Sequence, residues 1–344
     1  MASFLSEIRE QPAALHRLLD SLPAELEAVT PFYEQLRQGN FRTVIFTGMG
    51  SSLSACVPAT IILARHGIPA LLIEASELLA AYLPLLNAQT LVVMISQSGR
   101  SAEIVRLLDE VDPKVPIIGV TNTASSPLGE RSAVRLMMQA GAEATVSSKT
   151  YTCSLALLHL LALKLTNQAS VHAFTEVQAV ADQLADIIPR FEERAAEISR
   201  QIVPVKFIEF LGRGASRASA ITAALITKET VKMPTEGMAG GQFRHGPWEL
   251  LEPGIAVCLF SGSPATNSLD QALATDIIAR GATAIVIGST SQTGALHVPV
   301  PQNDPLLSPI LEIVPVQLLA AELASARGFT PGEFRYSGKI TTIE

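Results

Sequence analysis

A short segment around Gly99 gathers side chains that could bind an anion. Ser96, Gln97, Ser98 and Ser101 lie between an apolar run and a segment with helical periodicity. Three hydroxyls and one amide around a glycine are typical of a phosphate site made of neutral donors and a helix dipole. The alternative is a serine-capped helix start, for which one serine would be enough. The sequence therefore favours phosphate binding at this turn.

Two further turns are rich in glycine or hydroxyl groups. The sequence GMGSS follows an apolar run, and its glycines allow close approach of the backbone to a ligand. A simple strand-to-helix turn would use the same residue types. The sequence ATVSSKT precedes another helical segment, and we expect it to complete the pocket. The candidate binding residues in these two turns are Gly50, Ser51, Ser52, Val146, Ser147 and Ser148.

Glu229 is a candidate general base because of its place in a helical pattern. Ile221 and Leu225 precede it by eight and four residues, so the carboxylate continues an apolar stripe of the helix predicted at 218–232. Desolvation at such a position favours a carboxylate that accepts protons. The alternative is an edge-of-face carboxylate that pairs with Lys232, three residues further along.

His245 lies in the segment EGMAGGQFRHGP, which is too irregular for a core helix. The other five histidines lie in ordinary helix or strand-edge contexts, where a structural role is the default. We therefore single out His245 as the histidine that could take part in acid–base chemistry.

The strands and helices that position these residues repeat once along the chain. Residues 43–47 form a β-branched run that leads into GMGSS, and residues 206–211 lead into GRGAS, 164 residues later. The same offset carries the apolar run 92–95 onto 256–259. Continuous apolar strands separated by helices are typical of parallel sheets buried on both faces. The sequence predicts an α/β fold with two three-layer α/β/α sandwiches of flavodoxin-like or Rossmann-like type.

The chain divides into four expected parts. They are an N-terminal helical segment at 1–40, a first domain at 41–168, a helical linker at 169–203, and a second domain with a C-terminal active-site tail at 204–344. Prolines predict where the helices break. Pro189 divides the linker into helices at 171–188 and 190–202, and the region 6–38 is predicted to be another pair of helices, broken near Pro23.

Composition excludes several classes of protein. The 344 residues carry a formal net charge of −7, which leaves no excess of cations for a nucleic acid or an anionic membrane. Apolar runs such as 154–163 fall short of a membrane span. Cys56, Cys153 and Cys258 have no CxxC or CxxH spacing, so we expect no zinc site and no disulfide framework. A cytoplasmic protein with three buried thiols is expected.

Taken together, the motifs resemble tandem SIS (sugar isomerase) domains. The resemblance covers the chain from about residue 40 and rests on GMGSS, ISQSGRSAE, EATVSSKTYT, FLGRGASRASA, KE followed by EGMAGGQFRHGP, and the C-terminal SGKITTIE. The chain is most similar to the isomerase half of glucosamine-6-phosphate synthase. It is also similar to stand-alone amino-sugar-phosphate deaminases and fructosamine-6-phosphate deglycases.

The resemblance implies which residues bind the substrate. The 6-phosphate and nearby hydroxyls would be held by Ser51, Ser52, Ser96, Gln97, Ser98 and Ser101. Val146 and one serine of the following pair, Ser147 or Ser148, would contact the sugar. A phosphorylated amino sugar is therefore the expected ligand.

The resemblance also implies the chemistry. Glu229 corresponds to the base that moves a proton between C1 and C2, and His245 to the histidine that opens the sugar ring. In these relatives the histidine comes from the neighbouring subunit, which implies a homodimer. Lys339 matches the lysine that closes over the open-chain sugar.

Two departures from the synthase bear on the reaction. Ile226 replaces a lysine one helical turn before the base, and residue 2 is alanine, with no glutaminase domain ahead of the first strand. We therefore expect isomerisation or deamination, with glucosamine 6-phosphate going to fructose 6-phosphate and ammonia through an enediol or enolamine. Such proton transfer needs no metal and no redox cofactor. The alternatives are a fructosamine-6-phosphate deglycase and a non-catalytic sugar-phosphate sensor.

Overall fold

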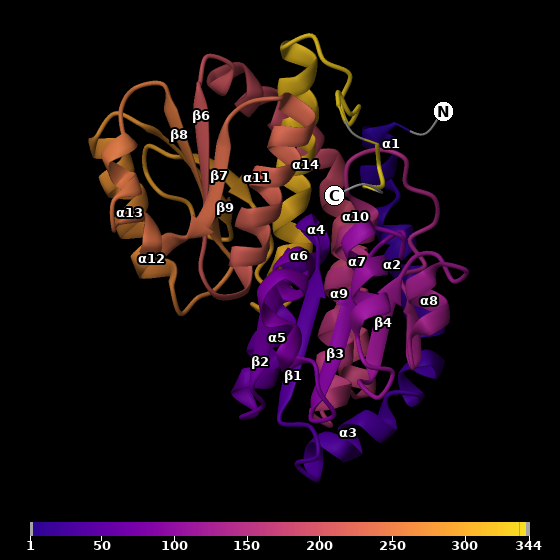
Figure 1. Ribbon diagram of the computed structural model, residues 1–344. Helices are drawn as coiled ribbons and strands as arrows, with labels where there is room; N and C mark the ends of the chain where they lie inside the picture. The colour runs from indigo at the N-terminus through magenta and orange to yellow at the C-terminus, as the bar shows by residue number, and fades with distance from the viewer. Residues whose placement is uncertain (1–2, 337, 342–344) are drawn as a thin grey trace. The chain divides into compact units, whose positions relative to one another are not determined.

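The computed structural model describes residues 3–336 and 338–341, so the predicted motif at 337–344 lies partly outside the described residues. Two parallel sheets, each of five strands, belong to two compact units (Figure 1). The first-sheet unit comprises residues 13–142 and 149–179 with the described part of 336–344. The second-sheet unit comprises the described part of 1–12 with 143–148 and 180–335.

The first sheet has the strand order β2-β1-β3-β4-β5, and every neighbouring pair is parallel. The central strands β1 and β3 are buried, apolar runs, as predicted. Their register pairs Gly48 with Ile95 at the carboxyl ends of the two strands. The five strands are β1 (Thr43–Gly48), β2 (Ala70–Glu74), β3 (Thr90–Ile95), β4 (Ile117–Thr121) and β5 (Val134–Met137).

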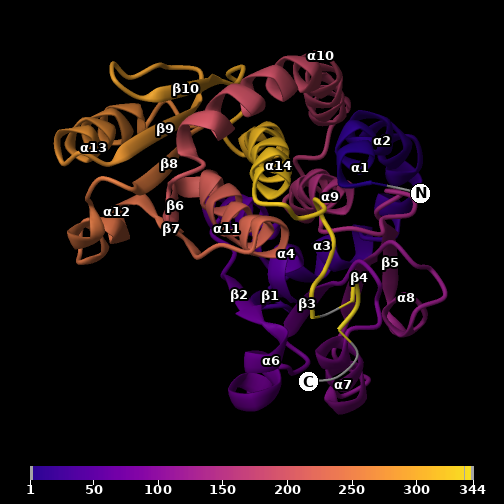
Figure 2. The same cartoon turned by 90° about the horizontal axis from the view of Figure 1, so that it is seen from above.

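Helices cover both faces of the first sheet. Ile45, Val92 and Met94 pack with Ile104 and Leu107 of α7 in one apolar cluster. Figure 2 shows α6 and α7 on this side of the sheet and α9, which packs against α5, on the other. The helices are α4 (Gly50–Ser54), α5 (Val57–Arg65), α6 (Ala75–Glu77), α7 (Ala102–Glu110), α8 (Pro127–Arg131) and α9 (Lys149–Leu165).

The second sheet repeats this arrangement, with the strand order β10-β9-β8-β6-β7. Its strands, all parallel, are β6 (Phe207–Gly212), β7 (Thr235–Ala239), β8 (Ile255–Ser261), β9 (Thr283–Gly288) and β10 (Leu296–Pro299). Leu211, Val257 and Leu259 pack with Leu273 and Ile277 of α13 (Asn267–Ala279). On the opposite face lie α11 (Arg217–Val231) and α14 (Ser308–Ala326) (Figure 2). The predicted pair of α/β/α sandwiches is confirmed.

Both helix breaks predicted at proline are wrong. Pro23 lies inside α2 (Gln11–Glu27), and Pro189 lies inside α10 (Val171–Ile202). The N-terminal region breaks instead between α1 (Phe4–Arg9) and α2, and again before α3 (Thr30–Arg37). An interior proline costs about 3 kcal/mol. Ile188 and Phe191, on either side of Pro189, are both buried. Because burying one such side chain contributes roughly 1.5–3 kcal/mol, packing on both sides offsets the lost backbone hydrogen bond.

One helix also departs from the expectation that no apolar segment reaches membrane-spanning length. Within the described residues, α14 is long and apolar enough to cross a membrane, but 83% of its most apolar window is buried inside the protein. Gln317 of α14 accepts a hydrogen bond from Gln11 at 2.8 Å. Such burial is typical of a core helix.

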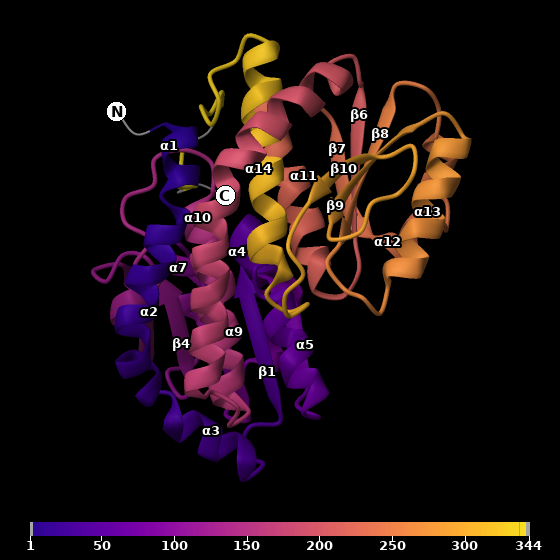
Figure 3. The same ribbon diagram turned by 180° about the vertical axis from the view of Figure 1, so that it is seen from behind.

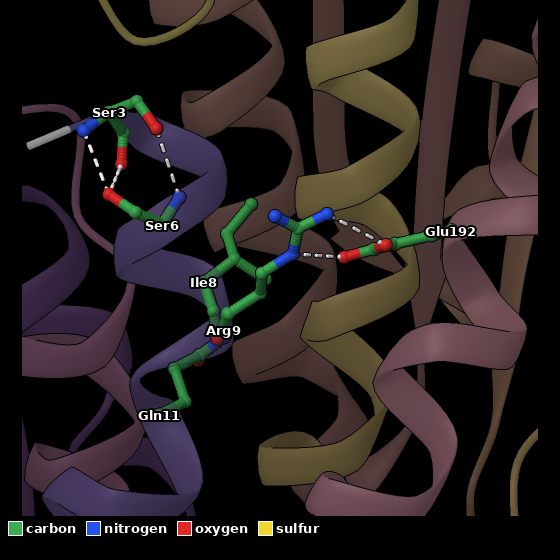
Figure 4. A network of polar contacts seen from close by, with 6 residues as sticks. All are labelled: Ser3, Ser6, Ile8, Arg9, Gln11 and Glu192. Carbon is green, nitrogen blue, oxygen red and sulfur yellow. Dashed lines mark hydrogen bonds and ion pairs between the residues drawn. The ribbon is translucent and has the colours of Figure 1, made fainter.

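The first helix, α1 (Phe4–Arg9), belongs to the second-sheet unit. Ser3 and Ser6 form a capping box at its start, and Arg9 makes two hydrogen bonds, of 2.7 and 3.0 Å, with Glu192 of α10 (Figure 4). The Arg9 side chain is 55% exposed, so this ion pair contributes little to stability. Phe4 and Ile8, which are fully buried, hold the helix in place instead.

Glu209, in the middle of β6, gives the fold a pH dependence. It is 1% exposed, and neither carboxylate oxygen has a hydrogen-bond partner among the described residues. Burial, with the charge of Glu236 on β7 as a second cause, raises its pKa to about 8. The folded state therefore keeps this proton where the unfolded chain has lost it, and the free energy of unfolding falls as pH rises from about 4.5 to about 8.

Replacing this carboxyl by an amide should remove that loss. We expect Glu209→Gln to raise the free energy of unfolding at pH 8 by a few kcal/mol, since one pKa unit is worth about 1.4 kcal/mol, and to change it little at pH 4. Urea unfolding between these pH values measures the effect. The control Glu236→Gln removes the exposed neighbouring charge, which is only the second cause of the raised pKa. In this variant the free energy of unfolding should still fall with pH, but over a narrower pH range. If the free energy of unfolding changes equally with pH in the wild type and in Glu209→Gln, the pH dependence does not come from Glu209.

Candidate active site

The first hydroxyl-rich turn follows the carboxyl end of β3. Ser96 Oγ lies 3.0 Å from Ser101 Oγ and accepts a hydrogen bond from the Gly99 N–H at 3.1 Å. Ser98 Oγ accepts one from the Arg100 N–H at 3.2 Å. Gly99 has a φ of +61°, and a Cβ there would lie 2.1 Å from Ser126 Oγ, so only glycine fits. Gln97, half-buried, completes the set of side chains at this strand end.

Ser101 is the N-cap residue of α7, but it does not act as a capping side chain. In the part of the chain that the structure describes, its hydroxyl makes no capping hydrogen bond and lies against Ser96 instead. The Ala102 N–H of the first turn of α7 donates to the Thr341 carbonyl oxygen at 3.2 Å. The C-terminal tail, which carries the half-buried Lys339, therefore reaches the start of this helix. The geometry does not support the capping alternative for Ser101.

The GMGSS turn lies beside this one. Gly48 is paired with Ile95, and a Cβ at Gly48 would lie 2.6 Å from the Ile95 carbonyl oxygen. Gly50 is exposed with a φ of +53°, and Ser51 and Ser52 are half-buried. Close backbone packing of β1 and β3 thus brings two of the three predicted turns together at the carboxyl edge of the first sheet, where ligands bind in open α/β sheets.

The third turn belongs to the second-sheet unit. The buried carboxylate of Glu7 on α1 accepts hydrogen bonds from the Ala144 N–H at 2.6 Å and from the Thr145 N–H at 3.3 Å. The Ser148 hydroxyl is fully buried and donates to Glu143 at 3.1 Å. Ser147 is half-buried, whereas Val146 is fully buried. Of the two serines that the sequence left open, Ser147 is the one with access to a ligand.

Glu229 lies in the last turn of α11 and is half-buried. Lys232, in the left-handed conformation at φ +58°, ends the helix, and its Nζ donates to the backbone carbonyl oxygens of Glu229 and, at 2.7 Å, Glu333. Burial and the charge of Arg335 lower the pKa of Lys232, while the charge of Glu229 raises it. Lys232 thus contacts the main chain of Glu229, and the charge of the Glu229 carboxylate acts on the Lys232 ammonium group. Ile226, one turn earlier, is fully buried.

His245 follows α12 (Gly240–Phe243) and is exposed. Arg244 pairs with Asp276 of α13 at 2.6 Å, and the Trp248 ring lies against the guanidinium groups of both Arg244 and Arg280, 5.8 and 4.3 Å from the ring centroid. These contacts attach the His245 segment to the α13 face of the second sheet. Sequence reasoning missed Asp276, which precedes Arg280 by four residues and is distant in sequence from His245.

Glu229 and His245 come from opposite faces of the same sheet. Glu229 is on α11, whereas Phe243, two residues before His245, is buried in the α13-side cluster (Figure 2). Sheets and the helices on them form layers about 10 Å apart. The second-sheet unit of one chain therefore keeps these two residues apart. Within the described residues, no group of three or more His, Cys, Asp or Glu side chains is arranged to hold a metal ion.

Comparison with known proteins identifies relatives along the whole chain. Glutamine–fructose-6-phosphate aminotransferase (isomerizing) of Pyrobaculum aerophilum is 31% identical over 352 residues, which is 99% of this chain and 57% of that protein. This chain thus spans little more than half the length of that relative. Two solved structures share the fold. The C-terminal domain of glucosamine-fructose-6-phosphate aminotransferase from Francisella tularensis has a TM-score of 0.83 at 22% identity, covering 96% of this chain and 97% of that one.

The second solved structure is glucosamine-6-phosphate deaminase from Thermotoga maritima, with a TM-score of 0.74 at 23% identity, covering 95% of this chain and 98% of that one. The family model described as SIS domain matches residues 39–164 and 201–327. The first segment contains all five strands of the first sheet and the second segment all five strands of the second. Because these two segments make up well over half of its length, the chain belongs to the SIS domain family.

Proposed function

We propose that this chain is an isomerase or isomerising deaminase of an amino-sugar 6-phosphate, with glucosamine 6-phosphate going to fructose 6-phosphate and ammonia as the type reaction. The observation that carries the proposal is the pair of hydroxyl-rich turns at the carboxyl edge of the first sheet. The relatives named for glucosamine 6-phosphate and fructose 6-phosphate support the substrate class.

Neutral groups would bind the phosphate. The proposed ligands are Gly50, Ser51, Ser52, Ser96, Gln97, Ser98 and Ser101, with the N-terminus of the nine-residue helix α7 behind them. Hydroxyl and amide donors together with a helix dipole stabilise an anion without a cationic side chain. A chain with a net charge of −7 can bind a phosphorylated sugar in this way.

Glu229 would transfer the proton. In the ring-opened amino sugar it removes the proton from C2 and returns it to C1, which gives the 2-imine of fructose 6-phosphate. Water then adds to C2 and ammonia leaves, so the step consumes no oxidant or reductant. General acid–base transfer of this kind contributes about 10²–10⁴ in rate. Val146 and Ser147 would contact the sugar, and Lys339 would close over the open-chain form.

We propose a homodimer in which His245 opens the ring of the sugar bound by the partner subunit. Two features support this arrangement: His245 is exposed, and it lies on the sheet face opposite to the helix that carries Glu229. A second copy related by a two-fold axis would present its own His245 at an equivalent position.

The three cysteines support a reducing, cytoplasmic location. Cys56, Cys153 and Cys258 are buried, and none of them forms a disulfide among the described residues. Burial raises the pKa of the Cys56 and Cys258 thiols, which makes them poor nucleophiles.

An assay of the products tests the proposed reaction. The protein, incubated with glucosamine 6-phosphate, should release ammonia and fructose 6-phosphate, and Glu229→Gln should lower kcat by about 10²–10⁴ with the affinity for the sugar phosphate preserved. Coupled detection of both products and calorimetric titration measure this. Glu236→Gln, an exposed carboxylate on β7, is the matched control and should keep full activity.

Other outcomes of that assay would assign another function. Release of a free amino acid from a fructosamine 6-phosphate, without ammonia from glucosamine 6-phosphate, would indicate a deglycase. Binding without turnover of either would indicate a sensor, which the apolar, buried Ile226 in place of the synthase lysine favours. Full activity of Glu229→Gln would remove Glu229 from the mechanism.

Subunit mixing tests the role of His245. Glu229→Gln and His245→Asn should each be inactive as a pure protein, but a hybrid dimer would contain one site with the native Glu229 of one chain and the native His245 of the other. Unfolding and refolding an equimolar mixture should therefore recover about a quarter of the wild-type activity, because half of the dimers are hybrids with one working site. Recovery of no activity would show that both residues act within one chain.

Substitution of two N-cap serines, Ser101 and Ser126, distinguishes a role in ligand binding from a role in helix capping. Ser101 makes no capping hydrogen bond, whereas Ser126 accepts one from the Gly129 N–H at the start of α8, at 3.1 Å. Ser101→Ala should weaken glucosamine 6-phosphate binding about tenfold, or about 1.4 kcal/mol, and leave the unfolding midpoint unchanged. Ser126→Ala should lose about 1 kcal/mol of stability and keep the affinity. Calorimetry and urea unfolding of both variants measure this, and the reverse pattern would favour the capping role for Ser101.

A further inference from the structure

The turn after β6 has the same backbone as the turn after β1. Met49 and Arg213 have φ, ψ angles of −122°, 148° and −122°, 149°, and Gly50 and Gly214 have φ angles of +53° and +56°. In both turns the serine two residues after that glycine donates its N–H to the carbonyl oxygen three residues before it, at 3.1 Å. Ser216 in the second turn therefore occupies the position of Ser52 in the first.

The second turn already holds a carboxyl group of the protein itself. Ser216 Oγ donates to Glu312 Oε1 at 2.7 Å, and Ser219 Oγ donates to Glu312 Oε2 at 2.5 Å. Ser216 is 2% exposed, and Ser219 and Glu312 are fully buried. Glu312 comes from α14, so this carboxylate joins the turn from a segment far away in sequence.

The same carboxylate lies against the turn that follows β8. A Cβ at Gly262 would lie 2.1 Å from Glu312 Oε1 and 2.9 Å from Ser216 Oγ. Gly262 is the second residue after Phe260, which pairs with Gly212, just as Gln97 is the second residue after Ile95, which pairs with Gly48. The carboxylate thus lies between the two strand ends that correspond to β1 and β3 in the first sheet, and glycine in place of glutamine leaves the space for it.

We propose that the Glu312 carboxylate occupies the anion position of the second turn, so that the second sheet is closed to phosphorylated ligands and becomes an anion site only when Glu312 is shortened. The assignment of Glu312 stands on contacts within the second-sheet unit. Its consequence, one phosphosugar per chain rather than two, rests on the proposed function.

Burial and the serine donors have opposite effects on the ionisation of Glu312. Burial raises its pKa to about 7, the hydrogen bonds from Ser219 and Ser216 lower it, and the charge of Asp270 on α13 raises it. Asp270 pairs with Arg213 at 2.9 Å and accepts a hydrogen bond from Thr266 at 3.1 Å. Two hydroxyl donors thus stabilise the ionised Glu312 in the same manner that serines of the first turn would stabilise phosphate.

Chemical rescue by a small carboxylate tests the proposal. Thermal unfolding of Glu312→Ala at neutral pH is compared in sodium formate and in sodium chloride at equal ionic strength. We expect formate to raise the Tm of Glu312→Ala by about 3 °C or more relative to chloride, as expected for a ligand that binds only the folded state. Wild type and Glu312→Gln, in which the position is filled, should respond equally to the two salts.

Two further variants make the outcome decisive. Ser216→Ala in the Glu312→Ala background removes a donor and should abolish the formate effect. If Glu312→Ala does not fold in chloride, Glu312→Ser is tested too, and the yield of refolded protein in formate against chloride becomes the measurement. If formate stabilises neither truncated variant, the proposal is overturned. Glu312 would then only connect α14 to α11 through its hydrogen bonds.

Ligand counting tests the consequence separately. Equilibrium dialysis of the wild type with glucosamine 6-phosphate should saturate at one ligand per chain, and two per chain would overturn the closure of the second sheet. Formate rescue does not depend on turnover. Failure of the proposed activity with intact rescue would therefore leave the assignment of Glu312 standing.

Discussion

The close parallel pairing of two central strands is the constraint on which the rest of the structure depends. In the first sheet, Gly48 lies so near Ile95 that a Cβ would come within 2.6 Å of its carbonyl oxygen. This approach places the GMGSS turn beside the turn of Ser96 and Ser98. Because parallel strands end at the same edge of a sheet, the chain needs only short, hydroxyl-rich turns to assemble an anion site there.

The duplicated sheet shows how one geometry can serve two purposes. Ser52 and Ser216 lie in turns of the same conformation, but among the described residues only the second serine has its hydroxyl bonded to an internal carboxylate, that of Glu312. Fully buried hydroxyls need partners, and Glu312 supplies them. In the second half the turn therefore contributes to packing between α11 and α14. The proposed chemistry uses other parts of that half, Glu229 and the segment of His245, on opposite faces of the sheet.

Sequence reasoning was most successful for the buried strands. The runs around Ile45, Val93 and Cys258 are continuous and apolar, and the structure confirms all three as central strands. It missed the outer strands, since β2 is half-exposed and β5 alternates between buried and exposed residues, patterns that also fit loops. It also misplaced helix ends at Pro23 and Pro189, because local propensity does not include the tertiary packing that carries a helix past a proline.

The sequence by itself determined the α/β class, the duplication, the family and the candidate residues, because strand periodicity, glycine and serine spacing and ordered motifs are local properties. Only the tertiary structure decided which candidates have access to a ligand. It showed that the buried Ser148 hydroxyl is hydrogen-bonded to Glu143, whereas Ser147 is half-buried. It also showed that the Ser101 side chain makes no capping hydrogen bond among the described residues. It also revealed that Glu312, on a helix 96 residues after Ser216, fills the second turn. Such contacts join residues distant in sequence, so packing rather than spacing sets them.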